Sequence, residues 1–243
     1  MRVRILGVGM GPQHVTPEVA DALRSCDYVL AADKGPVDGP GHGLLAARRA
    51  IAAAHGVEVV AVPDPERDRA DPADYPAAVR DWHEARVAAY EQVLRERRGD
   101  AAFLVWGDPS LYDSTIRVAE RLAELLPIEV DVMPGISAPQ LLAARHRIVL
   151  HDVGAPVHVT TARRLRDDVT AGQTNLVVML SGSLDLSGLD DWSIWSGVNL
   201  GDGSEELVSG RVGDVLADLD AARARAKQAA GWVMDVHLLR APR

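Results

Sequence analysis

The chain has 243 residues, of which 47% are hydrophobic and 25% charged, a composition typical of packed globular proteins rather than of global disorder. Its net charge of −9 argues against a general nucleic-acid binder, because neutralising phosphates requires a basic face. The single cysteine, Cys26, excludes an internal disulfide and a multi-cysteine metal site.

No apolar run approaches the ~18 residues that a membrane span requires. The N-terminal stretch MRVRILGVGMG becomes glycine-rich too early for a signal peptide. We therefore expect a cytoplasmic protein without membrane association.

The first half of the chain alternates strands with helices. The predicted strands are 2–8, 27–32, 58–62, 101–106 and 128–133. The predicted helices begin at Thr16-Pro17, cover 44–55 and 77–97, and follow the polar turn after Trp106. Several of the strands are nearly continuous apolar runs, which indicates a parallel sheet covered on both faces.

The pattern of predicted strands and helices changes after about Leu142. Short strands are predicted at 156–161, 175–180, 192–200, 206–212 and 231–239, with helices near 163–170 and 212–228. We expect an α/β protein of two domains: a parallel-sheet domain over 1–142 and a mixed-sheet α+β domain over 143–243.

The loop Gly7-Val8-Gly9-Met10-Gly11 suggests a dinucleotide site, and Asp33 stands near the expected position of a ribose-binding acid. However, Pro12 occupies the position of the last glycine, and the helix signal comes only at Thr16-Pro17. A dinucleotide loop opens its helix at the last glycine. We favour a loop that brings backbone close to a large ligand; a turn without a ligand is the alternative.

Four predicted strands end in turn-forming residues. In a parallel α/β sheet these ends lie along one edge, where ligands bind. The four ends are Gly7 to Gly11, Asp33-Lys34-Gly35, Gly107-Asp108-Pro109 and Pro134-Gly135-Ile136-Ser137.

In its order of Gly-x-Gly-x-Gly, Gly-Asp-Pro near Tyr112, and Pro-Gly-Ile-Ser-Ala, the chain resembles the tetrapyrrole (precorrin and uroporphyrinogen) methyltransferases. The resemblance covers nearly the whole chain and implies a two-domain fold with the active site in the cleft between the domains. Further stretches resemble a subgroup that methylates carbon 1 of its macrocycle and releases acetate. Trp106 replaces a small residue found in many members. The subgroup stretches are 64–69, 81–83, 106–115, 144–148 and 231–235.

The resemblance implies S-adenosylmethionine as cofactor, with S-adenosylhomocysteine as product. Methyl transfer from a sulfonium is an in-line displacement, so positioning matters more than acid–base assistance. The residues carried over as cofactor-binding are Gly107, Asp108, Pro109, Leu111, Tyr112, Ser137, Ala138, Met179, Leu180, Gly201 and Gly203.

The acceptor implied is a macrocycle fringed with carboxylates, which an acidic protein must bind through locally concentrated cations. Arginine suits carboxylates because its planar fork donates twice. Each cation alone could equally be a solvated surface residue. The candidates for substrate binding are Gly9, Gly11, Lys34, Arg117, Arg145, Arg147, Arg163 and Arg164, with Arg163-Arg164 preferred.

Loss of acetate requires water to attack an acetyl carbonyl, so a general base or a polarising donor is useful. Candidates are Asp33, Asp108, Tyr112 and Asp113, although Asp108 is equally suited to hold its own turn through backbone amides. No His, Asp and Glu set has metal-ligand spacing. Family members commonly form homodimers, and we expect one here.

Two other classes of function stay open. The same fold methylates other tetrapyrrole carbons, the diphthine precursor on a protein, or ribosomal RNA, of which low basicity disfavours the last. A nucleotide-dependent oxidoreductase or a non-catalytic nucleotide-binding module is the alternative from another class.

Overall fold

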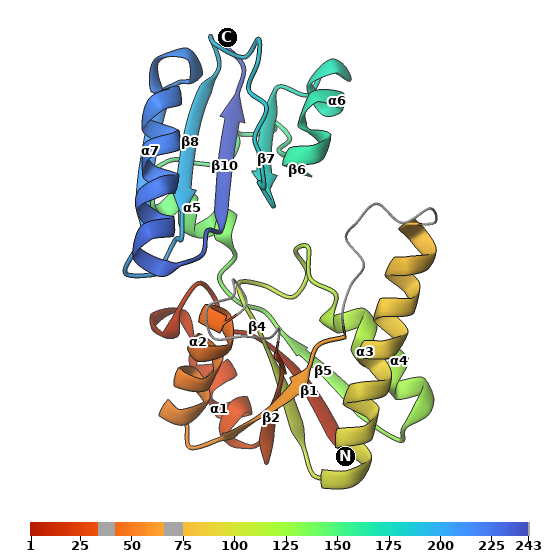
Figure 1. The fold of residues 1–243 in the computed structure, drawn as a ribbon. Helices are drawn as coiled ribbons and strands as arrows, with labels where there is room; N and C mark the ends of the chain where they lie inside the picture. The colour runs from red at the N-terminus through yellow and green to blue at the C-terminus, as the bar shows by residue number, and fades with distance from the viewer. Residues whose placement is uncertain (34–41, 66–74, 243) are drawn as a thin grey trace. The chain divides into compact units, whose positions relative to one another are not determined.

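The computed structural model describes residues 1–33, 42–65 and 75–242 of a chain that divides into two compact units (Figure 1). Unit 1 is Met1–Ile136 and unit 2 is Ser137–Arg243. The boundary predicted at Leu142 falls inside the helix α5 (Ala138–His146). Lys34, a predicted substrate-binding residue, lies outside the described residues, as does most of the 63–76 loop.

Unit 1 contains the predicted parallel sheet, with five strands in the order β3-β2-β4-β1-β5. The strands are β1 (Arg2–Gly7), β2 (Tyr28–Asp33), β3 (Glu58–Pro63), β4 (Ala101–Val105) and β5 (Glu129–Met133). The helices are α1 (Pro17–Arg24), α2 (His42–Ala54), α3 (Tyr75–Arg97) and α4 (Thr115–Leu125). The fold class predicted from the alternation of apolar runs and helices is confirmed.

Apolar layers cover both faces of this sheet, because successive side chains of a strand point to opposite faces. Leu6 packs with Leu23 of α1 and Ile51 of α2 on one face. Val3 packs with side chains of α3 and α4, including Leu122, on the other. Figure 1 shows the same division, with α1 and α2 on one side of the sheet and α3 and α4 on the opposite side.

The start of α1 follows the predicted signal. Thr16 caps the helix, its Oγ1 accepting a hydrogen bond from the Val19 amide at 3.3 Å, and Pro17 occupies the first helical position. The polypeptide between the glycine loop and this cap forms a short 3₁₀ turn, η1 (Pro12–His14). As the sequence predicts, α1 therefore does not begin at the glycine loop.

Unit 2 contains the predicted mixed sheet, in the order β6-β7-β10-β8-β9. β6 and β7 are parallel, whereas β10 is antiparallel to both β7 and β8, and β9 is antiparallel to β8. Its remaining elements are β6 (His158–Thr161), η2 (Ala162–Arg164), α6 (Leu165–Thr170), β7 (Asn175–Met179), β8 (Ser193–Val198), β9 (Glu206–Arg211), α7 (Val212–Ala230) and β10 (Asp235–Arg240).

The last strand begins at Asp235, later than the predicted 231–239. Gly231 ends α7 with φ of 74°, a left-handed conformation typical of glycine after a helix. Residues 232–234 then form a loop before β10 starts. Among the described helices, none is both long enough and apolar enough to cross a bilayer.

Candidate active site

The first and fourth strands of unit 1 end in glycine turns whose main chains bind one another. The Val8 amide donates to the Val105 carbonyl at 2.9 Å. Gly9 and Gly107 then exchange two hydrogen bonds, with N···O distances of 3.2 and 2.7 Å. Two motifs almost a hundred residues apart in the chain therefore form one backbone surface.

The third motif, Pro134-Gly135-Ile136-Ser137 after β5, packs against these two turns through contacts that only glycine permits. A Cβ on Gly7 would lie 2.4 Å from the Gly135 nitrogen. A Cβ on Gly135 would lie 2.2 Å from the Gly107 carbonyl oxygen and 2.7 Å from the Gly7 carbonyl. Such distances are far below van der Waals contact, so the three turns pack backbone against backbone.

Asp108 links the second and third motifs. Its Oδ2 accepts a hydrogen bond from the Gly135 amide at 2.9 Å, and its Oδ1 accepts from the Ser110 amide at 2.9 Å and from the Ser110 hydroxyl. Burial raises the pKa of this carboxyl, but the bonds from the Ser110 side chain and the two amides outweigh it, so the pKa lies below its ordinary value. These contacts favour an anchoring role for Asp108 over proton transfer.

Replacing Asp108 by asparagine is expected to lower the free energy of unfolding by about 1–2 kcal/mol at pH 7, because one of the amide contacts loses its acceptor. A lowered folded-state pKa gives stability that is present above the unfolded-state pKa and is lost as pH falls through the folded-state value. The free energies of unfolding of the two proteins, measured by urea titration, should therefore approach one another as the pH falls below about 4. A pH-independent difference would contradict the anchoring role.

The strand order places these turns at a reversal of the sheet's winding. β1 and β4 are neighbours, yet β1 leads through α1 to β2 and β4 leads through α4 to β5. The two connections leave on opposite faces of the sheet. Crevices form outside the carboxyl ends of such strand pairs, and this is where open α/β sheets bind ligands.

A polar pocket of about 330 Å³ lies at the carboxyl ends of β2 and β4. Three residues predicted from the sequence, Tyr112, Asp113 and Arg117, line it. Asp113 accepts a hydrogen bond at 2.6 Å from the amide of Thr115, the first residue of α4. The pocket is also lined by Arg48 and by four α3 residues: Trp82, His83, Arg86 and Tyr90.

Arg48 and Arg86 are pocket residues that the sequence pattern did not single out. Arg86 pairs with Asp64 at 2.6 Å and lies over the Trp82 ring, with its guanidinium carbon 4.4 Å from the ring centroid. Both arginines stand in helices, where arginines are usually solvated, and no local pattern separates them from the others. Trp82 and His83 carried a signal, because they belong to a subgroup stretch. Asp33 closes β2 and does not line this pocket.

Four predicted cofactor-binding residues of unit 2 end or follow strands that stop at the same end of its sheet. β7 and β8 both run antiparallel to β10, so Met179 and Leu180 lie at the same end as the turn that holds Gly201 and Gly203. Leu180 has φ of 56° and is 60% exposed. An exposed leucine in the left-handed region is unfavourable, and such strain is common where a ligand binds.

Tyr112 in unit 1 repeats this pattern, with φ of 50° and 47% exposure. Gly201 is held by a hydrogen bond from its amide to Glu205 at 2.7 Å. Ser137 is buried, and its amide and hydroxyl both donate to Gln140 Oε1 at 2.8 Å. Ser137 therefore starts α5, and Ala138 is the first residue of that helix.

The predicted cations of unit 2 differ in their surroundings. Arg145 pairs with Glu205 at 2.7 Å, and Arg164 lies 3.6 Å from Asp168. Arg163 is exposed in η2, and Arg147 is exposed at the end of α5. Arg145 and Arg147 thus belong to the end of α5, and Arg163 and Arg164 belong to η2.

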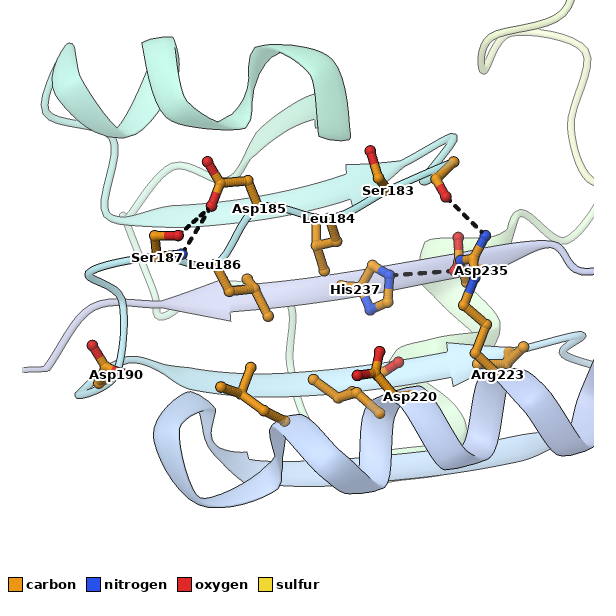
Figure 2. A pocket seen from close by; sticks show the side chains of 15 residues that line it. Ser183, Leu184, Asp185, Leu186, Ser187, Asp190, Asp220, Arg223, Asp235 and His237 are labelled. Atoms are coloured by element: carbon orange, nitrogen blue, oxygen red, sulfur yellow. Dashed lines mark hydrogen bonds and ion pairs between the residues drawn. The ribbon is translucent and has the colours of Figure 1, made fainter.

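Unit 2 also holds a pocket of about 530 Å³ between α7, β8, β10 and the segment that follows β7 (Figure 2). Arg223 of α7 pairs with the buried Asp235 and donates to the Gly182 carbonyl at 3.2 Å. His237 lies beside Asp235, with 3.8 Å between Nε2 and Oδ2. None of Met179, Leu180, Gly201 and Gly203 lines this pocket. Within the described ranges, no three His, Cys, Asp or Glu side chains gather as metal ligands.

A parallel α/β unit with three interlocked glycine turns, followed by a mixed-sheet unit, defines a class of methyltransferases. The chain belongs to the tetrapyrrole (corrin/porphyrin) methylases, whose family profile matches residues 2–192.

Its similarity to some relatives extends over nearly the whole chain, well beyond the family motifs. It is 38% identical over 251 aligned residues to the precorrin-6A synthase (deacetylating) of Sinorhizobium sp, covering 98% of this chain and 95% of that protein. The structure of a cobalamin synthesis related protein, CobF, of Corynebacterium diphtheriae superimposes with a TM-score of 0.83 at 34% identity over 98% of both chains. The cobalt precorrin-4 methyltransferase CbiF shares the fold at 16% identity, with a TM-score of 0.66 over 99% of this chain and 94% of that one.

Proposed function

We propose that this chain is the S-adenosylmethionine-dependent methyltransferase of cobalamin biosynthesis that methylates C-1 of precorrin-5 and forms precorrin-6A. The observation that carries the proposal is the 38% identity to a precorrin-6A synthase (deacetylating) over 98% of the chain. The methyl group leaves the sulfonium for C-1, water adds to the extruded acetyl carbonyl, and the products are S-adenosylhomocysteine, acetate and precorrin-6A.

The glycine turns supply what this reaction needs from the protein. In-line transfer requires a donor held in one orientation. Such positioning contributes far more to the rate of this step than acid–base assistance does. Interlocked backbone at Gly9, Gly107 and Gly135 gives a rigid surface without side chains in the way. The exposed, strained Tyr112 and Leu180 are suited to contact a bound ligand.

The cofactor contacts are proposed at the positions that the family motifs indicate. S-adenosylmethionine would supply the electrophilic methyl group there, and the chain supplies main-chain amides and carbonyls. The proposed positions are Gly107, Asp108, Pro109, Leu111, Tyr112, Ser137, Ala138, Met179, Leu180, Gly201 and Gly203. Of the acid–base candidates, Tyr112 and Asp113 line the polar pocket, which favours them over Asp33 for deacetylation.

The decisive experiment incubates the purified protein with precorrin-5 and S-adenosylmethionine. We expect equal amounts of S-adenosylhomocysteine and acetate, measured by mass spectrometry and by proton NMR. Turnover of the cofactor with another tetrapyrrole and without acetate would indicate a different member of the family. Methylation of the diphthine precursor would do the same.

A nucleotide-dependent oxidoreductase is disfavoured by the strand order. Dinucleotide-binding sheets place the first strand beside the second and fourth, in the order 3-2-1-4-5-6. Here β4 lies between β2 and β1. A melting temperature raised by NADH and unchanged by S-adenosylhomocysteine would reverse this conclusion.

A homodimer and a cytoplasmic location stay predictions, which light scattering and cell fractionation can test.

A further inference from the structure

Arg48 occupies a position where β2 and β4 separate. The two strands pair only as far as Leu30 and Phe103, although β2 continues beside β3 to Asp33. The carbonyl of Leu104, released from the ladder, accepts a hydrogen bond from Arg48 Nε at 2.8 Å. This bond holds the guanidinium of an α2 residue at the pocket between the strand ends.

The charge of Arg48 has no partner in the described parts of unit 1. Burial lowers the pKa of its guanidinium, and the charge of Asp113 offsets this effect only in part. No described carboxylate of unit 1 forms an ion pair with Arg48. Its two terminal nitrogens make no hydrogen bond with any described residue, while the residue lines the pocket. Because arginine keeps its charge in proteins, desolvation without a counter-ion is costly.

Two other arginines of unit 1, Arg4 and Arg86, form ion pairs with carboxylates. The buried Arg4 lies 3.6 Å from Asp100 and 3.9 Å from Asp131. Arg86, in the same pocket as Arg48, pairs with Asp64 at 2.6 Å. An internal carboxylate therefore neutralises each of them, and Arg48 departs from that pattern.

A second cation faces the same space. Arg117, in the first turn of α4, lines the pocket, is exposed, and forms no ion pair with the described residues. Among the described residues that line the pocket, Asp113 is the one carboxylate, and its Oδ1 accepts a hydrogen bond from the Thr115 amide. Among the described residues of the pocket, the two guanidinium groups that form no ion pair outnumber the one carboxylate, Asp113, which attracts Arg48 only from beyond ion-pair distance. Guanidinium forks match carboxylates in geometry.

We propose that Arg48 and Arg117 form a carboxylate-binding subsite for one acidic side chain of the acceptor macrocycle. The proposal rests on the proposed function, since it assigns a position to part of that substrate. Arg48 selects the anion from a partly buried, preorganised position, and Arg117 adds attraction at the pocket mouth.

The test compares Arg48→Met with Arg49→Met, a matched loss of charge at an exposed neighbour in the same helix that does not line the pocket. The probe is uroporphyrin, a stable octacarboxylate tetrapyrrole, titrated by fluorescence, with its octamethyl ester as the uncharged control. S-adenosylhomocysteine affinity and melting temperature are measured on every protein.

We expect Arg48→Met to weaken uroporphyrin binding about 10- to 100-fold and Arg49→Met to change it less than about twofold. Arg48→Lys keeps the charge without the fork and should fall between. S-adenosylhomocysteine affinity should not change. The melting temperature of Arg48→Met should change little, because removing a partly buried charge stabilises the protein while losing the bond to the Leu104 carbonyl destabilises it.

Unchanged uroporphyrin binding by Arg48→Met, or a lower melting temperature with binding lost in parallel to stability, would overturn the subsite. If the wild-type protein converts precorrin-5 while Arg48→Met binds normally, the subsite alone fails. If the wild-type protein binds neither uroporphyrin nor S-adenosylhomocysteine, the proposed function fails with it.

Discussion

Replacing Gly135 by alanine is expected to destabilise unit 1 by about 3 kcal/mol or more and to abolish S-adenosylhomocysteine binding. The added Cβ would lie 2.2 Å from the Gly107 carbonyl oxygen and 2.7 Å from the Gly7 carbonyl. All of these are backbone atoms, so no side chain can rotate away, and three strand ends must shift together. Urea titration and isothermal calorimetry with S-adenosylhomocysteine measure the two effects.

Gly182→Ala is the matched control. A Cβ on Gly182 meets nothing within 4 Å, and its φ lies outside the left-handed region. We expect its free energy of unfolding to stay within about 0.5 kcal/mol of wild type. Gly7→Ala should resemble Gly135→Ala, and the double variant should cost less than the sum, because both substitutions disrupt the same contact. A Gly135→Ala protein as stable as wild type would show that the turns do not interlock.

Replacing Arg223 by methionine is expected to lower the free energy of unfolding by about 2–4 kcal/mol at neutral pH. The Asp235 side chain is only 4% exposed, so removing its partner leaves a charge in a poorly solvated position. Arg223 is itself 36% exposed, which places the expected loss toward the lower part of that range. Chemical denaturation monitored by circular dichroism provides the measurement.

Arg225→Met provides the comparison on the same helix. Arg225 pairs with Glu206 through two hydrogen bonds, but the two side chains are 57% and 27% exposed. Exposed pairs contribute little, so we expect a loss below about 1 kcal/mol. The double variant of Arg223→Met with Asp235→Asn should recover part of the stability. Equal losses for the two arginine variants would mean that the burial of Asp235 has no energetic consequence.

Several features of the candidate site could be predicted because their causes are local. Thr16-Pro17 starts a helix whatever surrounds it, since a hydroxyl cap and a proline act on adjacent backbone. Glycine after an apolar run marks the end of a strand in the same way. Because the carboxyl ends of parallel strands share one edge, the positions of Gly9 and Gly107 in the chain were enough to place them at the same edge of the sheet.

Other features depend on which strands become neighbours. The sequence alone did not predict that β4 lies between β2 and β1, and this order brings Gly107 onto Gly9 and exposes the Leu104 carbonyl to Arg48. Nothing in the alanine-rich helix distinguishes Arg48 from Arg49, since only the pocket beside one of them differs. The pairing of Arg223 with Asp235 likewise joins a helix to a strand through tertiary packing.

The amino-acid sequence by itself determined the class of fold, the order of the motifs and the residues that end each strand, because each arises from short-range backbone preferences and apolar periodicity. The tertiary structure alone decided which charges are buried, which are neutralised and which face a pocket. The energy of a charge depends on every group and water molecule around it, and those neighbours come from distant parts of the chain.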